Sequence, residues 1–408
     1  MSAFLKGVVL TNSIKYNCVF GGGGIRGLCY IGAIKALDEQ NIQLNSIAGS
    51  SVGAVFAMLY AIGYNATEIK EFFMNFYLNM FRDINIKIFD GDISFSKGEI
   101  FLEWLREKIE KKYYCNNYIK GKNHPVRFKD LEKDLLILTL DINTNTPYIF
   151  SKENTPDEEV AMAVRISAGM PGLMKPIRQN GNILVDGDLI KTRPAFKIYD
   201  SLNNKNTRLL EFRLEGTRTE SSLKNPSDYI NSVISTIWYL STENIYNLYH
   251  QNDRYDFIIT DTKEVIMFDF TIDKAVREEL IEKGYNTTKY YLTKTLVEKK
   301  KIINKIYKNI LLKIKNAQKQ INTNNADTFI NIINDILSTM YEDTKYIDIS
   351  IYEEIENLKH LILPNIKPRL LFANKIKNMQ EIKKQTDYII MLLSERIEDI
   401  EQYITNLS

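Results

Sequence analysis

Two glycine-rich turns follow one another closely near the start of the chain, at residues 21–27 and 49–53. Each turn comes after a short apolar segment and before a stretch with apolar residues at helical spacing, over 28–37 and 52–62. This repeated order of strand, sharp turn and helix is typical of sheets covered by helices. The pattern therefore predicts an α/β fold with two sharp strand-to-helix turns.

The second turn, Gly49-Ser50-Ser51-Val52-Gly53, has the G-x-S-x-G spacing of a nucleophile elbow. The flanking glycines let the chain turn so tightly that the serine oxygen is pushed outward, with a helix starting directly behind it. Ser51 is therefore the candidate nucleophile. The first turn has no side chains that block its amides and also opens a helix, so its N–H groups can stabilise a developing oxyanion.

A serine nucleophile needs a base, and the aspartates are better candidates than the histidines. The chain has three histidines, His124, His250 and His360. None of them lies at a turn after a predicted strand, which is the kind of position that presents a base. Two Asp-Gly-Asp turns occur, at 90–92 and 186–188. The second follows a buried-strand pattern, so Asp186 lies at a strand's carboxyl end, where reacting groups gather in α/β sheets. The turn at 90–92 is interpreted as a surface turn, and a Ser-His-Asp esterase remains a minor alternative.

Taken in order, these segments resemble the patatin-like phospholipases. Residues 22–27 resemble the family's oxyanion loop, 49–53 its nucleophile elbow, and Asp186-Gly187 followed by Pro194 its catalytic-aspartate loop. The segment 163–172 resembles the stretch before that aspartate. The resemblance implies a mostly parallel central sheet flanked by helices. It also implies a lipid acyl hydrolase of phospholipase A or lysophospholipase type, which forms an acyl-enzyme and needs no metal or cofactor.

The resemblance assigns a role to each residue of these segments. It implies a catalytic dyad of Ser51 and Asp186, and an oxyanion hole formed by Gly22, Gly23, Gly24 and Ile25. It gives supporting roles to Gly49, Gly53, Arg26, Gly27, Gly187 and Asp188. Arg26 is expected either to brace the loop or to meet a lipid phosphate.

Asp188 departs from the family pattern, which usually has Gly or Ala at this position. A second carboxylate two residues from the base is expected to raise the pKa of one of the pair, because like charges repel. We interpret the departure as a perturbation of the site rather than its inactivation.

Two alternatives come from other classes of protein. Gly22-x-Gly24-x-x-Gly27 after a strand also fits a dinucleotide-binding turn, but that fingerprint expects an acidic residue where the second strand ends in Gly49-Ser50-Ser51. The second alternative is a regulated or non-catalytic scaffold that acts through its C-terminal helices. The presence of both Ser51 and Asp186 argues against it.

The substrate is less constrained than the chemistry. Residues 71–81, EFFMNFYLNMF, are rich in aromatic residues and methionine. Such a segment can line an acyl-chain channel or form a lid, and it can equally be an ordinary core helix.

The length of 408 residues favours two domains, which we place at 1–290 and 291–408. Beyond residue 291 the chain becomes lysine-rich, and its apolar residues over 295–322 fall on one stripe of an amphipathic helix. Further helical patterns follow, so the second domain is predicted to be all-helical. Its first helix is either a solvated face or a surface for anionic membranes, formed by Lys299, Lys300, Lys301, Lys305 and Lys308.

Charge and targeting signals exclude several classes. The net charge of +2 gives no general attraction to nucleic acid, and three cysteines do not suggest a disulfide framework. The N-terminus has no signal-peptide pattern, and the longest apolar stretch, 52–62, is too short to span a bilayer. We expect a cytoplasmic protein. Peripheral binding to membranes, or export without an amino-terminal signal, would also fit the sequence. The sequence carries no signal for oligomeric state.

Overall fold

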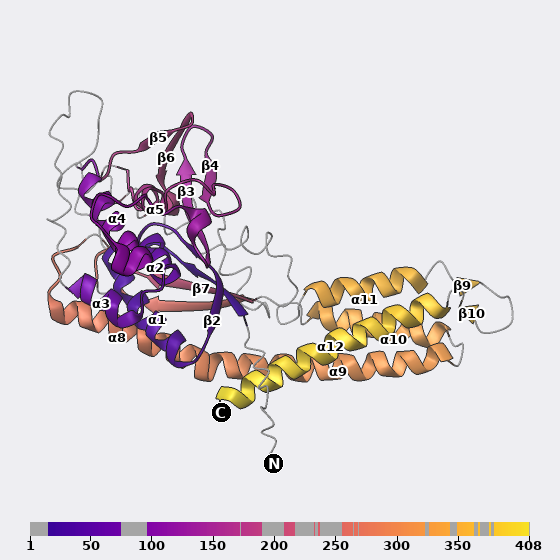
Figure 1. Cartoon of the computed structure of the whole chain (residues 1–408). Helices are drawn as coiled ribbons and strands as arrows, with labels where there is room; N and C mark the ends of the chain where they lie inside the picture. The colour runs from indigo at the N-terminus through magenta and orange to yellow at the C-terminus, as the bar shows by residue number, and fades with distance from the viewer. Residues whose placement is uncertain are drawn as a thin grey trace, which may run out of the picture.

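The protein has an α/β region and an elongated helical region that extends from one side of it (Figure 1). The computed structural model describes residues 15–74, 96–171, 173–189, 208–216, 232, 236, 255–263, 265–267, 269–322, 326–342, 349–362, 366–367, 375–376 and 379–407. Within these helices, no segment combines the length and the apolar character that crossing a membrane requires.

The central sheet has the strand order β5-β6-β3-β2-β1-β7-β8, with β4 paired to β3. Strands β8, β7, β1, β2 and β3 run parallel, whereas β4 and β6 pair antiparallel with β3, and β5 pairs antiparallel with β6. The mostly parallel sheet implied by the resemblance is therefore confirmed. The strands are β1 (Lys15–Phe20), β2 (Gln43–Gly49), β3 (Asp134–Asp141), β4 (Thr146–Phe150), β5 (Ile177–Gln179), β6 (Asn182–Asp186), β7 (Arg208–Glu215) and β8 (Tyr255–Asp261).

Strands β2 and β6 point toward one another along the same edge of β3. Ile137 pairs with Gly49 of β2 and with Phe150 of β4, so β2 and β4 lie on opposite edges of β3. Thr139 pairs with β4 and also with Asp186 of β6. Because a strand has only two edges, β6 must continue the line of β2 beyond its end. Its antiparallel direction therefore brings its last residue to the carboxyl end of β2.

The helices of the α/β region cover the sheet (Figure 1). Helix α2 packs against β1, β2 and β3 and also contacts α5, while α1 packs along α8. The helices are α1 (Cys29–Glu39), α2 (Val52–Ala61), α3 (Ala66–Met74), α4 (Glu99–Tyr114), α5 (Val160–Ser167) and α8 (Lys274–Tyr290). Short 3₁₀ helices are η1 (Gly24–Leu28), η4 (Cys115–Asn117), η5 (Phe128–Asp130) and η6 (Gly187–Leu189).

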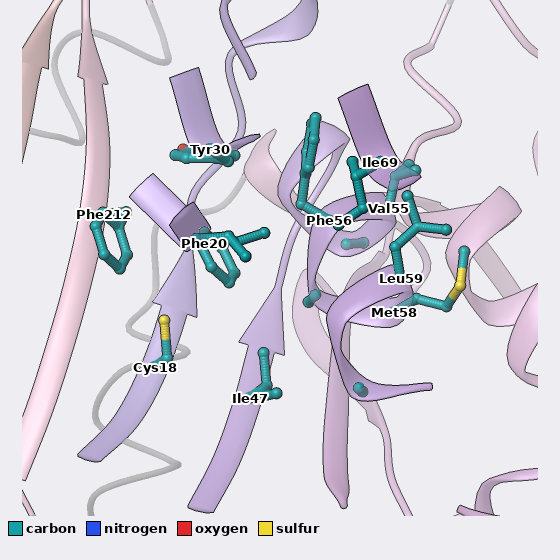
Figure 2. Close-up of a cluster of buried hydrophobic side chains, with 14 of the residues drawn as sticks. Cys18, Phe20, Tyr30, Ile47, Val55, Phe56, Met58, Leu59, Ile69 and Phe212 are labelled. Atoms are coloured by element: carbon teal, nitrogen blue, oxygen red, sulfur yellow. The ribbon is translucent and has the colours of Figure 1, made fainter. Parts of the chain in front are cut away.

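The main core lies between the sheet and these helices, as Figure 2 shows. Phe20, at the end of β1, stacks on Phe212 at 5.2 Å between ring centroids and lies 5.0 Å from the ring of Tyr30. Val19 points to the opposite face of the sheet, where it packs with Leu209 and Phe257. Both faces of β1 are therefore buried, which explains the uninterrupted apolar residues Cys18, Val19 and Phe20 at its end.

The helical region has a separate core formed by four helices, and the helical character predicted for this region is confirmed. These helices are α9 (Leu296–Asn322), α10 (Ala326–Glu342), α11 (Ile349–Ile362) and α12 (Met379–Leu407). The predicted stripe of α9 is buried at Ile303, Ile310 and Ile314. One feature was not predicted, a short antiparallel pair of strands, β9 (Ile366–Lys367) and β10 (Lys375–Ile376).

The boundary predicted at 290/291 falls inside a continuous helical segment. Helix α8 passes through a π-helical turn, η7 (Tyr291–Thr295), directly into α9. Leu292 and Leu296 still belong to the core of the α/β region, whereas Ile303 is in the core of the four helices. Tyr403, near the end of α12, returns to the first core. Residues from both ends of the helical region therefore contact the α/β region.

Candidate functional site

Ser51 lies in a strained turn between β2 and α2. Its backbone has φ 54° and ψ −131°, a conformation that residues other than glycine rarely adopt. A side chain on Gly53 would overlap the carbonyl of Phe20, and one on Gly49 would overlap the backbone of the following helix. The two glycines thus allow β1, the turn and the helix to pack closely enough to hold Ser51 in this conformation.

The Ser51 hydroxyl donates a hydrogen bond to Asp186, with 2.8 Å between Oγ and Oδ2. Asp186 is the last residue of β6, and the head-on arrangement of β6 and β2 brings the two side chains together. Asp186 is 0% exposed and Ser51 is 9% exposed. The structure therefore pairs the predicted nucleophile with the predicted base in a largely buried site.

The environment of Asp186 favours the protonated carboxyl group. Burial raises its pKa to about 8, and the nearby Asp188 carboxylate contributes to the rise. Hydrogen bonds from the Asp188 N–H and from Ser51 act in the opposite direction, because they stabilise the carboxylate. The resulting pKa is suited to a group that accepts and returns a proton near neutral pH.

Helix α5 supplies supporting residues that the sequence did not single out. The Ser167 hydroxyl donates to the carbonyl of Leu138 at 2.5 Å and accepts the Ser51 N–H at 3.1 Å. The carbonyl of Gly169 accepts the N–H of Asp186 at 3.2 Å. The end of α5 therefore contacts both members of the pair. The signal in the sequence was the resemblance of segment 163–172, which did not specify these contacts.

The glycine loop lies against the elbow, but only part of it is available to an oxyanion. The N–H of Ile25 donates to the carbonyl of Met267 at 3.0 Å, and that of Gly22 donates to Asp188 at 3.3 Å. In this conformation the N–H groups of Gly22 and Ile25 are therefore already used, and their assignment to the oxyanion hole stays a prediction. The N–H groups of Gly23 and Gly24 have no acceptor among the residues that the structure describes. They are the remaining candidates.

The supporting residues brace these turns. Arg26 is 5% exposed, and its Nε donates to the carbonyl of Val265 at 2.7 Å, so this guanidinium nitrogen is held by backbone. Of the two roles expected for Arg26, the structure favours bracing over contact with a phosphate. Gly27 allows η1 to pack closely on Val52, and Gly187 allows the aspartate loop to pack on the carbonyl of Leu138.

The other residues considered in the sequence either lie outside this site or fall outside the described residues. His360 lies in α11, and the backbone carbonyl of His124 accepts the Tyr114 hydroxyl in a loop after α4. His250, Pro194 and the turn at 90–92 are outside the described residues. Helix α3 includes 71–74 of the aromatic segment, and its Phe73 stacks on Phe56 at 4.9 Å, as in an ordinary core helix. Residues 75–81 are outside the described residues.

The predicted lysine surface on α9 is only partly exposed. The Nζ atom of Lys299 donates to the carbonyl of Tyr255 at 2.6 Å, and Lys300 is 0% exposed. The prediction is wrong for these two residues, because consecutive helical residues point in different directions and part of a lysine run must face inward. Lys301, Lys305 and Lys308 are exposed.

Comparison with known proteins matches residues 18–197 to the family model of patatin-like phospholipases. An uncharacterised protein of Acanthamoeba polyphaga mimivirus is 28% identical over 295 residues, which cover 69% of this chain and 94% of that protein. A probable lipid hydrolase of Invertebrate iridescent virus 6 is 27% identical over 191 residues, covering 46% of this chain and 65% of the viral protein.

A lysophospholipase of Kluyveromyces lactis is 28% identical over 188 residues, which are 43% of this chain but only 11% of that larger protein. Among solved structures, VipD from Legionella pneumophila aligns over 96% of this chain and 90% of its own, with a TM-score of 0.46 and 14% identity.

Proposed function

We propose that this protein, whose residues 18–197 form a patatin-like phospholipase domain, is a lipid acyl hydrolase of phospholipase A or lysophospholipase type. The observation that carries the proposal is the 2.8 Å hydrogen bond from Ser51 Oγ to Asp186 Oδ2, beside a glycine loop in which the N–H groups of Gly23 and Gly24 have no acceptor among the described residues. The similarity to a probable lipid hydrolase and to a lysophospholipase supports a lipid substrate. The protein would then be a serine ester hydrolase.

The proposed reaction has two steps that share one base. Asp186 accepts the proton of Ser51 as Oγ attacks the ester carbonyl, and the N–H groups of Gly23 and Gly24 stabilise the oxyanion. Collapse of the tetrahedral intermediate breaks the ester bond, and the leaving alcohol takes the proton from Asp186. Water then attacks the acyl-enzyme with Asp186 again as base. The fatty acid leaves, and Ser51 regains its proton.

The direct test is lipid analysis after incubation of the full-length protein with vesicles of mixed phospholipids and, separately, with lysophospholipids. Release of free fatty acid, with matching loss of one acyl position, supports the proposal and identifies the preferred headgroup. If no acyl ester of any kind is cleaved, the scaffold alternative would be favoured instead.

The pKa of Asp186 predicts the pH dependence of this activity. Only the carboxylate can accept the Ser51 proton, so kcat/KM should rise about tenfold per pH unit below about pH 8 and level off above it. The measurement is hydrolysis of a soluble short-chain chromogenic ester across this range. A rate that stays constant down to pH 5 would show that the base titrates far lower than its burial implies.

We also propose that the helical region binds anionic membranes through its exposed lysines. Lys301, Lys305 and Lys308 lie on one side of α9, and each lysine near an anionic surface contributes about 1 kcal/mol. Changing all three to Gln should weaken binding to anionic vesicles by roughly 100-fold at low salt. Cosedimentation at low and high salt measures this effect, and hydrolysis of a soluble ester should stay unchanged.

A matched control removes the same charge elsewhere. Lys120, which follows α4, and Lys383 and Lys384, on α12, are exposed and belong to elements other than α9. Changing these three to Gln should leave vesicle binding close to that of the unmodified protein. Equal losses in both triple variants would mean that net charge, rather than the α9 surface, determines binding.

A further inference from the structure

Asp188 is buried in the site but has no role in the proposed proton transfer. Its side chain is 7% exposed, and its backbone N–H donates to Asp186 Oδ1 at 2.8 Å. A buried carboxylate that takes no part in the proton transfer needs an explanation of its own. A buried charge is costly unless hydrogen bonds compensate for it.

One oxygen of Asp188 joins two parts of the site. Asp188 Oδ1 accepts the Ser50 hydroxyl at 2.7 Å and the Gly22 N–H at 3.3 Å. Ser50 precedes the nucleophile, and Gly22 precedes the candidate oxyanion donors. Together with the bond from its own N–H to Asp186, Asp188 therefore links the glycine loop, the elbow and the aspartate loop.

The second oxygen explains why position 22 must be glycine. A Cβ atom on Gly22 would overlap Asp188 Oδ2 and lie 3.0 Å from the Cβ of Ser51. The Asp188 carboxylate thus occupies the space that a side chain on residue 22 would fill. The fit of Asp188 against Gly22 holds the glycine loop at its present distance from the nucleophile.

We infer that Asp188 is a positioning residue that clamps the oxyanion loop to the nucleophile elbow and directs the Gly22 N–H away from the substrate. This inference rests on the proposed ester hydrolase function. The clamp leaves Gly23 and Gly24 as the donors to the oxyanion, and its hydrogen bond to Ser50 fixes the residue next to the nucleophile.

The charge of the clamp has a consequence that a purely structural contact would lack. Asp186 and Asp188 repel one another, and Asp188 also interacts with the Tyr30 hydroxyl of α1. Asparagine at position 188 keeps an oxygen acceptor for Ser50 and Gly22 but carries no charge. It should therefore keep the clamp and make Asp186 easier to deprotonate.

The experiment compares the unmodified protein with Asp188→Asn and Asp188→Ala by pH profiles of kcat and KM on a soluble ester. Asp188→Asn should keep the plateau rate within a few-fold and move the midpoint of the profile to lower pH. Asp188→Ala loses the clamp, so its plateau kcat should fall at least about tenfold with little change in KM. Thermal unfolding shows whether each variant is folded.

The outcomes separate this inference from the proposed function. An unmodified protein that cleaves no ester overturns the proposed function itself. An active protein in which Asp188→Asn leaves the midpoint unchanged and Asp188→Ala leaves kcat unchanged overturns the clamp alone. If Asp188→Ala does not fold, Ser50→Ala decides the question, because it removes the hydrogen bond from the elbow to Asp188; an unchanged kcat in that variant overturns the clamp.

Discussion

Replacing Ser51 with alanine is expected to lower kcat for ester hydrolysis by about 10⁴-fold or more while leaving the protein folded. The hydroxyl is the only group of this residue that the proposed reaction uses, and Asp186 has no proton to accept without it. The removed oxygen is hydrogen-bonded to Asp186, whereas the backbone at position 51 is held by Gly49, Gly53 and the Ser167 hydroxyl. Circular dichroism shows whether the variant is folded, and the release of fatty acid measures its activity.

Ser50 provides the matched control, since it adjoins Ser51 and has a buried hydroxyl of its own. Its Oγ donates to Asp188 rather than to Asp186, so Ser50→Ala should weaken the clamp and cost roughly tenfold, far less than Ser51→Ala. Near-normal activity in Ser51→Ala together with an inactive Ser50→Ala would reassign the nucleophile to Ser50.

The turns of the site could be predicted from the sequence because local backbone rules determine them. The spacing of Gly49, Ser51 and Gly53 predicts the elbow, since only glycine allows such close approach of strand and helix. The short apolar segment 182–185 predicts β6 and places Asp186 at its end. These features depend on residues within a few positions of one another, so the pattern of residue types is sufficient to recognise them.

The contacts that complete the site could not be predicted, because they depend on pairing between distant segments. Nothing local to β6 indicates that it runs antiparallel to β3 and meets β2 end to end. Likewise, the use of the Ile25 N–H by Met267 depends on a loop more than two hundred residues away. The inward direction of Lys300 depends on the packing of α9 against the α/β region.

Replacing Asp186 with asparagine should have two opposite effects, a loss of activity and a gain of stability that grows with pH. Activity should fall by about 10⁴-fold, because the amide cannot accept the Ser51 proton. The stability effect follows from burial. The folded protein holds the Asp186 proton up to a pKa of about 8, whereas an unfolded chain releases it near the ordinary pKa of 3.8.

The pH window of this gain follows from the sign of the shift. A raised folded-state pKa stabilises the folded protein fully below the unfolded value, and that stabilisation is lost as pH rises through the folded value. Each unit of difference corresponds to about 1.4 kcal/mol, so wild-type stability should fall by several kcal/mol between about pH 4 and about pH 8. Asparagine carries no charge at any pH, so the stability of the variant should not fall with pH in this way.

Urea unfolding at acid and at alkaline pH therefore tests the buried carboxyl group independently of catalysis. Asp186→Asn should become progressively more stable than the wild type as pH rises toward 9. Asp90→Asn, in the other Asp-Gly-Asp turn, is the matched control and should keep both turnover within a few-fold and the wild-type dependence of stability on pH. An inactive Asp90→Asn beside an active Asp186→Asn would reverse the choice of base.

A stability difference that does not change with pH would mean that Asp186 is already charged in the folded protein. The base would then be a permanent carboxylate that the hydrogen bonds from Ser51 and the Asp188 N–H keep ionised.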